Sequence, residues 1–148
     1  MSIIIREAGL DDIAPIVELE QGFAAEDRFP AKTWLRLMQG HSCVHVVKKD
    51  LKLVGAAVHL FRKGSSVARL YSISVAPEAR GQGLAQLLMA HGEDVAREKV
   101  CTRMRLEVRE SNEAAISLYK RSGYRVIAKI EGYYPDGEAA QRMEKVLT

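Results

Sequence analysis

Long apolar stretches are absent from this sequence of 148 residues. The longest nearly apolar run, Leu53 to Phe61, is far shorter than the ~20 residues that a membrane-spanning helix needs. The chain starts Met-Ser-Ile-Ile-Ile-Arg-Glu and becomes charged at once, so it lacks the basic n-region of a secretory signal. We therefore expect a cytoplasmic protein with no membrane partner.

Cysteines are also scarce, since the chain has only Cys43 and Cys101. Two residues cannot make a disulfide framework, and their spacing is not that of metal ligands. The four histidines are scattered without an i, i+4 pair: His41, His45, His59 and His91. The sequence therefore predicts no metal site and two buried thiols in a reducing compartment.

No concentrated run of one charge is present either. The net charge is +3, and residues 1–74 carry 10 basic and 8 acidic side chains against 12 and 11 in residues 75–148. Nucleic-acid-binding proteins usually carry a concentrated basic stripe, so we expect no nucleic-acid partner. Length and composition fit one globular domain over residues 1–148, as a monomer or a homodimer.

Hydrophobic periodicity predicts eleven elements in the order β-α-α-β-β-β-α-β-α-β-β, which is a mixed α/β (α+β) domain. The expected ranges are strands at 3–6, 44–47, 53–61, 67–75, 103–109, 124–130 and 142–147, and helices after 12, after 30, from 84 and from 112 to 123. We expect Asp11 or Asp12 to cap the first helix. On the second helix, Trp34, Leu35 and Met38 should face inward.

The most informative segment is the turn Arg80-Gly81-Gln82-Gly83, which joins a predicted strand to a long predicted helix. Closely spaced glycines let backbone N–H groups point into one concavity, and the helix behind them adds partial positive charge, so an anion is favoured there. A P-loop is excluded because Leu84-Ala85 follows Gly83, and the dinucleotide fingerprint lacks its third glycine. The remaining alternative is a tight turn that binds nothing.

This segment also carries a family resemblance. Arg80-x-x-Gly83-x-Ala85, preceded by Ile73-Ser74-Val75, resembles the Arg/Gln-x-x-Gly-x-Gly/Ala signature of the GNAT superfamily of acetyl-CoA-dependent N-acetyltransferases. The resemblance implies a mostly antiparallel sheet with flanking helices and two splayed parallel strands that hold the cofactor. In that family the loop amides bind the pyrophosphate of CoA, and the preceding strand offers its backbone to the pantetheine arm.

A second segment extends the resemblance, since Leu106-Glu-Val-Arg109 and Asn112-x-x-Ala-x-x-Leu-Tyr119 are similar to the RimI-type branch, which acetylates the N-termini of ribosomal proteins. This similarity implies Glu107 as general base, Tyr119 as general acid and Asn112 as a ligand of the pantetheine arm. The cofactor-binding residues implied in total are Ile73, Ser74, Val75, Arg80, Gly81, Gln82, Gly83, Leu84, Ala85, Gln86, Asn112 and Tyr119.

Asn112, Tyr119 and Glu107 each also have a purely structural interpretation. Asn112 is a good N-cap, and Tyr119 shares a helix face with apolar residues, as a core aromatic would. Glu107 lies between arginines on the polar side of its strand, which is also typical of a solvated charge ladder. Neighbouring arginines favour the ionised carboxylate and so weaken it as a base; we therefore expect it to act through a water.

A weak base favours an acceptor that loses its proton easily. An α-amine titrates near 7.7–8.0 and a lysine near 10.4, a difference of about 3.4 kcal/mol in deprotonation cost. The sequence thus predicts transfer of an acetyl group from acetyl-CoA to a primary amine, with a peptide N-terminus preferred. The alternatives are a small-molecule amine acceptor, such as an amino acid, polyamine or antibiotic, and a non-catalytic acyl-CoA sensor.

Overall fold

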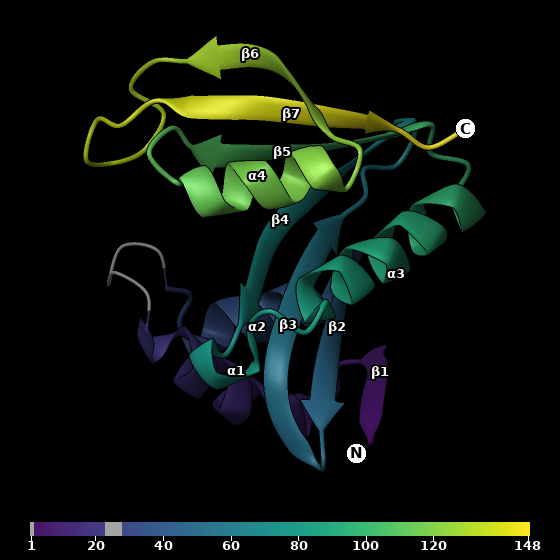
Figure 1. The fold of residues 1–148 in the computed structure, drawn as a ribbon. Coiled ribbons are helices and arrows are strands. Elements are labelled where there is room, and N and C mark those ends of the chain that lie inside the picture. Colours follow the sequence, from purple (N-terminus) through teal and green to yellow (C-terminus); the bar gives the residue numbers. More distant parts are fainter. Residues whose placement is uncertain (1, 23–27) are drawn as a thin grey trace.

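The computed structural model describes residues 2–22 and 28–148, which are organised around one seven-stranded sheet of order β1-β2-β3-β4-β5-β7-β6 (Figure 1). The strands are β1 (Ile3–Glu7), β2 (Ser42–Lys49), β3 (Lys52–Leu60), β4 (Val67–Val75), β5 (Arg103–Arg109), β6 (Arg125–Ile130) and β7 (Ala140–Val146). The helices are α1 (Ile13–Leu19), α2 (Ala31–Gln39), α3 (Leu84–Glu98) and α4 (Glu113–Arg121), with 3₁₀ turns η1 (Leu10–Asp12), η2 (Glu20–Gly22) and η4 (Pro77–Ala79). The predicted element order and mixed α/β class are confirmed.

Two local expectations are wrong. Neither Asp11 nor Asp12 caps α1 with its side chain; the Asp12 carboxylate instead accepts from the Gly9 backbone N–H and the Arg6 guanidinium. On α2, Trp34 is buried as expected, but Leu35 is 37% exposed. One residue further along a helix turns the side chain by about 100°, so Leu35 leaves the face that Trp34 buries.

Apolar side chains form a separate core on each side of the sheet. α1 and α2 cover one side of β2 and β3, where Ile16 and Trp34 pack on Val44 and Val46. α3 and α4 lie on the other side, where Leu88 and Tyr119 join the larger core (Figure 1). No described helix is long and apolar enough to cross a membrane.

The pairing of β4 with β5 is parallel and short, whereas every other pairing in the sheet is antiparallel. It covers only Val67 to Arg69 against Arg103 to Arg105. From there to their C-terminal ends at Val75 and Arg109 the two strands diverge, which confirms the expected splay. β4 remains bonded to β3 up to Val75, so its peptide groups that point toward β5 have no strand partner there.

Candidate active site

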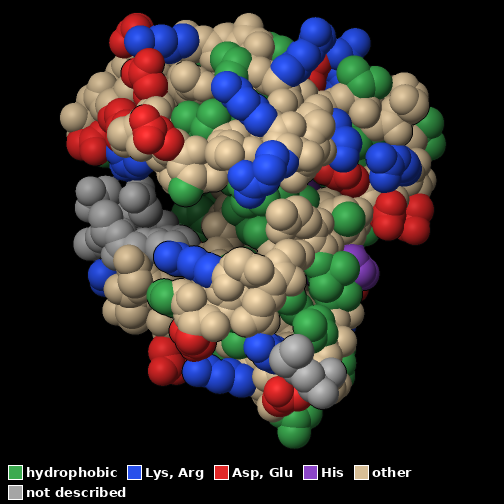
Figure 2. Space-filling model, viewed as in Figure 1, with side chains coloured by type: hydrophobic (Ala, Val, Ile, Leu, Met, Phe, Trp, Pro, Cys, Tyr) green, Lys and Arg blue, Asp and Glu red, His purple; other side chains and the backbone are tan. Residues whose placement is uncertain are grey.

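The divergence of β4 and β5 opens two adjoining cavities. The first, of about 710 Å³, reaches from Tyr71 on β4 to Glu107 on β5, and the second, of about 680 Å³, reaches from Ile73 to the glycine loop. Asn112 and Tyr119 line both. Figure 2 shows the surface hollowed below α4, with hydrophobic side chains in the hollow. A molecule that spans both cavities would thus pass Asn112 and Tyr119.

The glycine loop is built to leave backbone N–H groups open. Gly81 and Gly83 both have φ of +78°, a left-handed conformation that favours glycine. A Cβ at either position would meet no atom within 4 Å, so the backbone angle rather than crowding requires glycine. Among the described residues, no backbone hydrogen bond engages the N–H groups from Gly81 to Gln86. These groups and the N-terminus of α3 make a site for an anion.

Two polar side chains of the loop point elsewhere. Arg80 Nε donates to the carbonyl of Val75 at 3.3 Å, which ties the loop to the end of β4. Gln82 Oε1 accepts from Lys49 Nζ at 2.8 Å, and Gln82 is the one cofactor residue implied by the resemblance that does not line either cavity. The side chain of Gln82 therefore anchors the loop to the hairpin of β2 and β3.

Asn112 has the geometry of an N-cap, because its Oδ1 accepts from the Ala115 backbone N–H at 3.1 Å. The same residue is exposed and lines both cavities. Capping uses only the side-chain oxygen, so the amide nitrogen still has two donors. The capping role and a ligand role are compatible.

Tyr119 belongs to the core and to the cavity wall at once. It is 7% exposed, and burial raises the pKa of its phenol to about 12. Its ring lies edge-on to Tyr124 with centroids 6.1 Å apart. The Tyr124 hydroxyl donates to Glu93 Oε2 at 2.9 Å, whereas no hydrogen bond to the Tyr119 hydroxyl is found in the described part of the chain. Tyr119 is thus the tyrosine of this pair with a free donor.

Glu107 is buried between two arginines, but not the ones its sequence neighbours suggest. Its side chain is 6% exposed; Oε1 lies 3.0 Å from Arg69 Nη1, and Oε2 lies 2.8 Å from Arg142 Nε. Tyr133 also donates to Oε1, at 3.5 Å. The expectation that the arginines of β5 contact Glu107 is wrong, because Arg103, Arg105 and Arg109 pair with other carboxylates. Glu107 is therefore not part of a solvated charge ladder.

Aromatic side chains form the wall of the first cavity opposite α4. The Phe29 ring stacks on Tyr71, with centroids 5.5 Å apart and planes at 13°, and meets Trp34 edge-on at 5.5 Å. Tyr133 and Tyr134 close another side. Tyr71 was missed in the sequence, although the alternation of β4 places it on the side of the sheet opposite Leu70.

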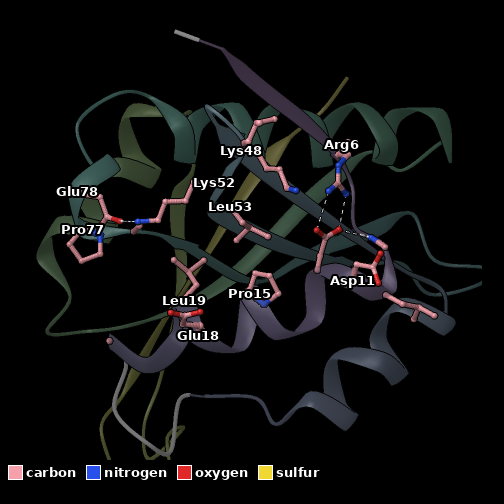
Figure 3. Close-up of a pocket in the computed structure, with 16 residues that line it drawn as sticks. Arg6, Asp11, Pro15, Glu18, Leu19, Lys48, Lys52, Leu53, Pro77 and Glu78 are labelled. Carbon is pink, nitrogen blue, oxygen red and sulfur yellow. Dashed lines mark hydrogen bonds and ion pairs between the residues drawn. The ribbon is translucent and has the colours of Figure 1, made fainter.

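A third cavity, of about 1100 Å³, lies between α1 and the hairpin of β2 and β3 (Figure 3). Its walls carry the ion pairs Arg6–Asp12, at 2.7 Å, and Lys52–Glu78, at 3.0 Å. None of the site residues expected from the sequence lines it. It is larger than the two cavities beside β4 and β5, but none of the expected carboxylate, tyrosine or glycine-loop groups faces it, so we place the chemistry at the two smaller ones. No group of three or more potential metal ligands is found in residues 2–22 and 28–148.

Comparisons with known proteins agree with this geometry. Residues 11–124 match the model of the acetyltransferase (GNAT) family. A putative ribosomal protein bS18-alanine N-acetyltransferase of Bacillus subtilis is 30% identical over 139 residues, covering 92% of this chain and 90% of that protein. Thialysine N-epsilon-acetyltransferase of Sus scrofa is 33% identical over 97 residues, covering 62% and 57%. The ribosomal-protein-S18-alanine N-acetyltransferase structure from Escherichia coli superposes with a TM-score of 0.87 at 27% identity, covering 99% and 95%.

Proposed function

Because the chain belongs to the acetyltransferase (GNAT) family and is an N-acetyltransferase, we propose that it moves the acetyl group of acetyl-CoA directly onto the α-amine at a peptide or protein N-terminus. The whole chain, residues 1–148, acts as one domain in this reaction. The observation that carries the proposal is the divergence of β4 and β5, which joins an anion site to a cavity that holds a carboxylate.

The loop side of the site fits the donor. Acetyl-CoA supplies an activated thioester and carries phosphate groups. The open N–H groups of Gly81 to Gln86 would hold its pyrophosphate, as the family resemblance implies. The unpaired edge of β4 at Ile73 to Val75 offers backbone hydrogen bonds to an extended arm, and Asn112 stands opposite. A β4 N–H near Val75 would polarise the thioester carbonyl.

Tyr119 and Glu107 divide the proton transfers. With a pKa of about 12, Tyr119 is a weaker acid than a thiol, which titrates near 8.5. It therefore stabilises a departing thiolate by donating a hydrogen bond before any full proton transfer. Glu107 Oε1 and Oε2 are already engaged by arginines, so Glu107 accepts the amine proton through a water. Both side chains line the cavity that is proposed for the acceptor.

The acceptor proposal rests on a base whose two oxygens are both already paired with arginines, because such a base favours an acceptor that loses its proton easily. An α-amine is about 3.4 kcal/mol easier to deprotonate than a lysine, and a relative that matches 92% of this chain is named for the alanine of ribosomal protein bS18. A small or side-chain amine is the second candidate, because the Sus scrofa relative is named for thialysine. Membership of an acetyltransferase family supports catalysis over a non-catalytic sensor.

One screen tests the acceptor. The protein and acetyl-CoA are mixed with one acceptor at a time. The acceptors are unblocked peptides, the same peptides with a blocked N-terminus and an internal lysine, and the small amines thialysine, polyamines and free amino acids. Release of thiol is recorded, and products are identified by mass spectrometry. We expect thiol release with unblocked peptides and an acetylated N-terminus. Thiol release only with small amines or with lysine-bearing blocked peptides would overturn the α-amine proposal. If none of the amines tested causes thiol release, acetyl transfer to amines is overturned.

A further inference from the structure

One side of the sheet between β4 and β6 gathers charges from four strands. Residues that oppose each other in register share a side of a sheet. The pairings of β5 with β4 and β7, and of β7 with β6, therefore place five arginines and two glutamates together. We name this surface the arginine face: Arg69, Arg103, Arg105, Arg125 and Arg142 with Glu107 and Glu144.

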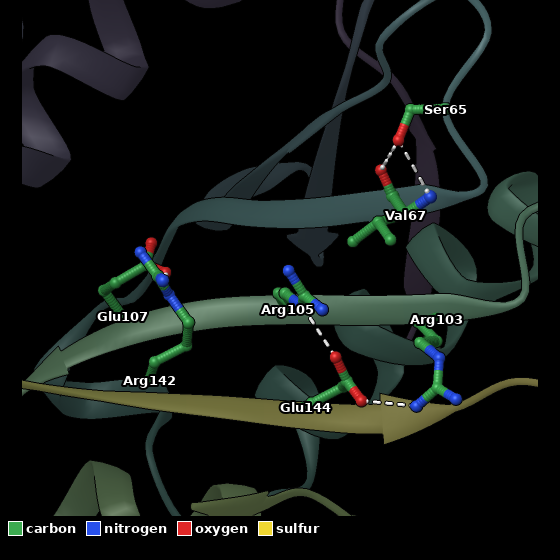
Figure 4. A network of polar contacts seen from close by, with 7 residues as sticks. All are labelled: Ser65, Val67, Arg103, Arg105, Glu107, Arg142 and Glu144. Atoms are coloured by element: carbon green, nitrogen blue, oxygen red, sulfur yellow. Dashed lines mark hydrogen bonds and ion pairs between the residues drawn. The ribbon is translucent and has the colours of Figure 1, made fainter. Parts of the chain in front are cut away.

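Each glutamate of the arginine face is paired with two arginines. Figure 4 shows Arg103 and Arg105 at Glu144, and Arg142 beside Glu107. Glu144 binds Arg103 Nη1 at 2.5 Å and Arg105 Nε at 2.6 Å, and hydrogen bonds from Arg105 and then Arg103 lower its pKa. Glu107 binds Arg69 and Arg142 in the same manner. The two carboxylates are 5–6% exposed, whereas the arginine side chains are 30–42% exposed. The acids are covered and the guanidinium edges face solvent.

The arginine face is therefore a positive surface. Five arginines less two glutamates leave +3, which equals the net charge of the whole chain. Arg109 shares this side, but the loop acids Asp136 and Glu138 bind it at 2.8 and 3.0 Å. Each of the four paired arginines uses one nitrogen in its ion pair and keeps further N–H donors. Such donors suit carboxylates, which arginine can bind with two parallel hydrogen bonds.

The arginine face is also continuous with the proposed acceptor cavity. Glu107 belongs to both, and Arg69 lies two residues from the cavity-lining Tyr71 on the same side of β4. Along β5, Arg103 and Arg105 precede Glu107 at intervals of two residues, which is about 6.6 Å each. An extended peptide repeats its side chains at the same interval. A polypeptide whose first residue enters the cavity can thus place later side chains over these arginines.

We propose that the arginine face selects acceptors by binding acidic side chains a few residues after the acetylated N-terminus. This inference rests on the proposed function and adds the substrate class: peptides that carry Asp or Glu at about positions 3 to 6. A nucleic acid fits less well, because a surface of +3 is small beside the 6–10 phosphate contacts of typical nucleic-acid-binding proteins. Two of the five arginine charges are also offset by the buried glutamates.

Matched peptides test the substrate class. Three unblocked peptides share their length and first two residues and carry four Asp, four Asn or four Lys at positions 3 to 6. We expect kcat/KM to be about 5-fold higher with Asp than with Asn, since one partly exposed ion pair contributes about that factor. We expect the Lys peptide to be the poorest, and the preference to shrink as salt rises because the contacts are exposed. Equal kcat/KM for the three peptides overturns the proposal.

Two variants connect the preference to the surface. Arg125→Glu reverses an exposed charge opposite Glu144 on β6, far along the sheet from the cavity. We expect it to raise KM for the Asp peptide about 5-fold, to lower KM for the Lys peptide and to leave kcat unchanged. Arg36→Glu makes the same charge change on α2, outside the arginine face, and should shift neither KM. If both variants shift KM alike, the effect is one of net charge and the proposal fails.

A binding measurement separates this proposal from the proposed function. N-acetylated, fluorescent versions of the peptides cannot react, so anisotropy reports binding alone. If no peptide is acetylated but the Asp version binds best and Arg125→Glu weakens it, the arginine face stands and the acceptor proposal fails. If peptides are acetylated without an acidic preference, the reverse holds. Tighter binding of a single-stranded RNA probe, lost in Arg125→Glu, would replace the acidic peptide by a nucleic acid and overturn the proposal.

Discussion

The two halves of the sheet, β1 to β4 and β5 to β6, differ in how their two sides are covered. From β1 to β4 the sheet has helices on both sides, and β2 and β3 are buried along most of their length. From β5 to β6 it has an apolar side under α3 and α4 and an open side of ion pairs. The first half is held by apolar burial and the second adds polar contacts that tolerate solvent. The proposed reacting groups, Glu107 and Tyr119, line the cavity that opens where β4 and β5 diverge.

A substitution at Gly92 should break the first half most severely. A Cβ at Gly92 would meet ring atoms of His59 at 2.0 Å, and that ring is only 1% exposed. We expect Gly92→Ala to lower the free energy of unfolding by about 3 kcal/mol. Denaturant unfolding measures it. Helix propensity alone would give the opposite sign, a gain of about 1 kcal/mol, so the exposed Ala90→Gly is the matched control and should lose about that amount. A stabilised Gly92→Ala would contradict the close packing of α3 on β3.

Tyr119 tests the junction between the halves. Tyr119→Phe removes one hydroxyl and leaves the ring in the core, so we expect kcat to fall about 100-fold, the lower range for an acid catalyst, with little change in the Kd of acetyl-CoA. Steady-state kinetics and calorimetry measure the two quantities. Tyr124→Phe is the control, because its hydroxyl bonds Glu93 and not the cavity; it should reduce stability and spare kcat. Equal kcat for Tyr119→Phe and the wild type would exclude the hydroxyl from the reaction.

The halves should also respond to acid over different ranges. Burial lowers the pKa of His59 to about 3. Below about pH 6.5 the His59 side chain therefore binds a proton in the unfolded chain but stays neutral in the folded chain. Stability is therefore full above pH 6.5 and falls by about 1.4 kcal/mol per pH unit below it, until His59 itself protonates. Burial also lowers the pKa of His45, which adds to this loss. Glu144, in the second half, has a lowered pKa, so its contribution disappears only at more acidic pH.

Denaturant midpoints between pH 7 and pH 5 measure the histidine contribution. His59→Gln cannot charge in this range, so its stability should depend less steeply on pH than that of the wild type, although the substitution costs packing at every pH. Glu144→Gln is the matched control from the second half, and it should keep the wild-type slope. A His59→Gln slope that equals the wild-type slope would place the acid sensitivity elsewhere.

Local patterns explain which parts of this comparison the sequence could predict. The strict alternation of Met104, Leu106 and Val108 is a period-2 signal, and it predicted β5 and its buried side. The glycine loop and the Asn112 cap are signals within a few residues, so they could be identified as well. The two carboxyl-terminal strands were also found, although β7 begins at Ala140, two residues earlier than expected.

Contacts between distant strands could not be predicted. Arg69 and Arg142 are far from Glu107 in the sequence, and only the registers of β4 and β7 with β5 bring them together. Charge counted along the sequence is even, because register rather than chain order gathers the arginines on one side. The predicted cap of α1 was wrong for a similar reason. The Asp12 carboxylate pairs with Arg6 of β1, and this contact replaces the expected cap.

The smallest expected effect lies at the link between the halves, where α3 ends before β5. Val100 has φ of +63° at the position after the helix where glycine is favoured, with Val100 N–H bonded to the Arg97 carbonyl and Cys101 N–H to that of Ala96. A β-branched residue is strained there. Relief of the left-handed strain, about 1–2 kcal/mol, exceeds the entropic cost of glycine, about 0.5–1 kcal/mol. Val100→Gly should therefore raise the free energy of unfolding by about 0.5–1 kcal/mol, because Val100 is 79% exposed and little burial is lost. Lys99→Gly lies one residue earlier, at φ of −86°, and should lower the free energy of unfolding. Thermal unfolding of the two variants measures the difference. If both variants are destabilised, Val100 is not strained, and the link between the two halves costs no stability.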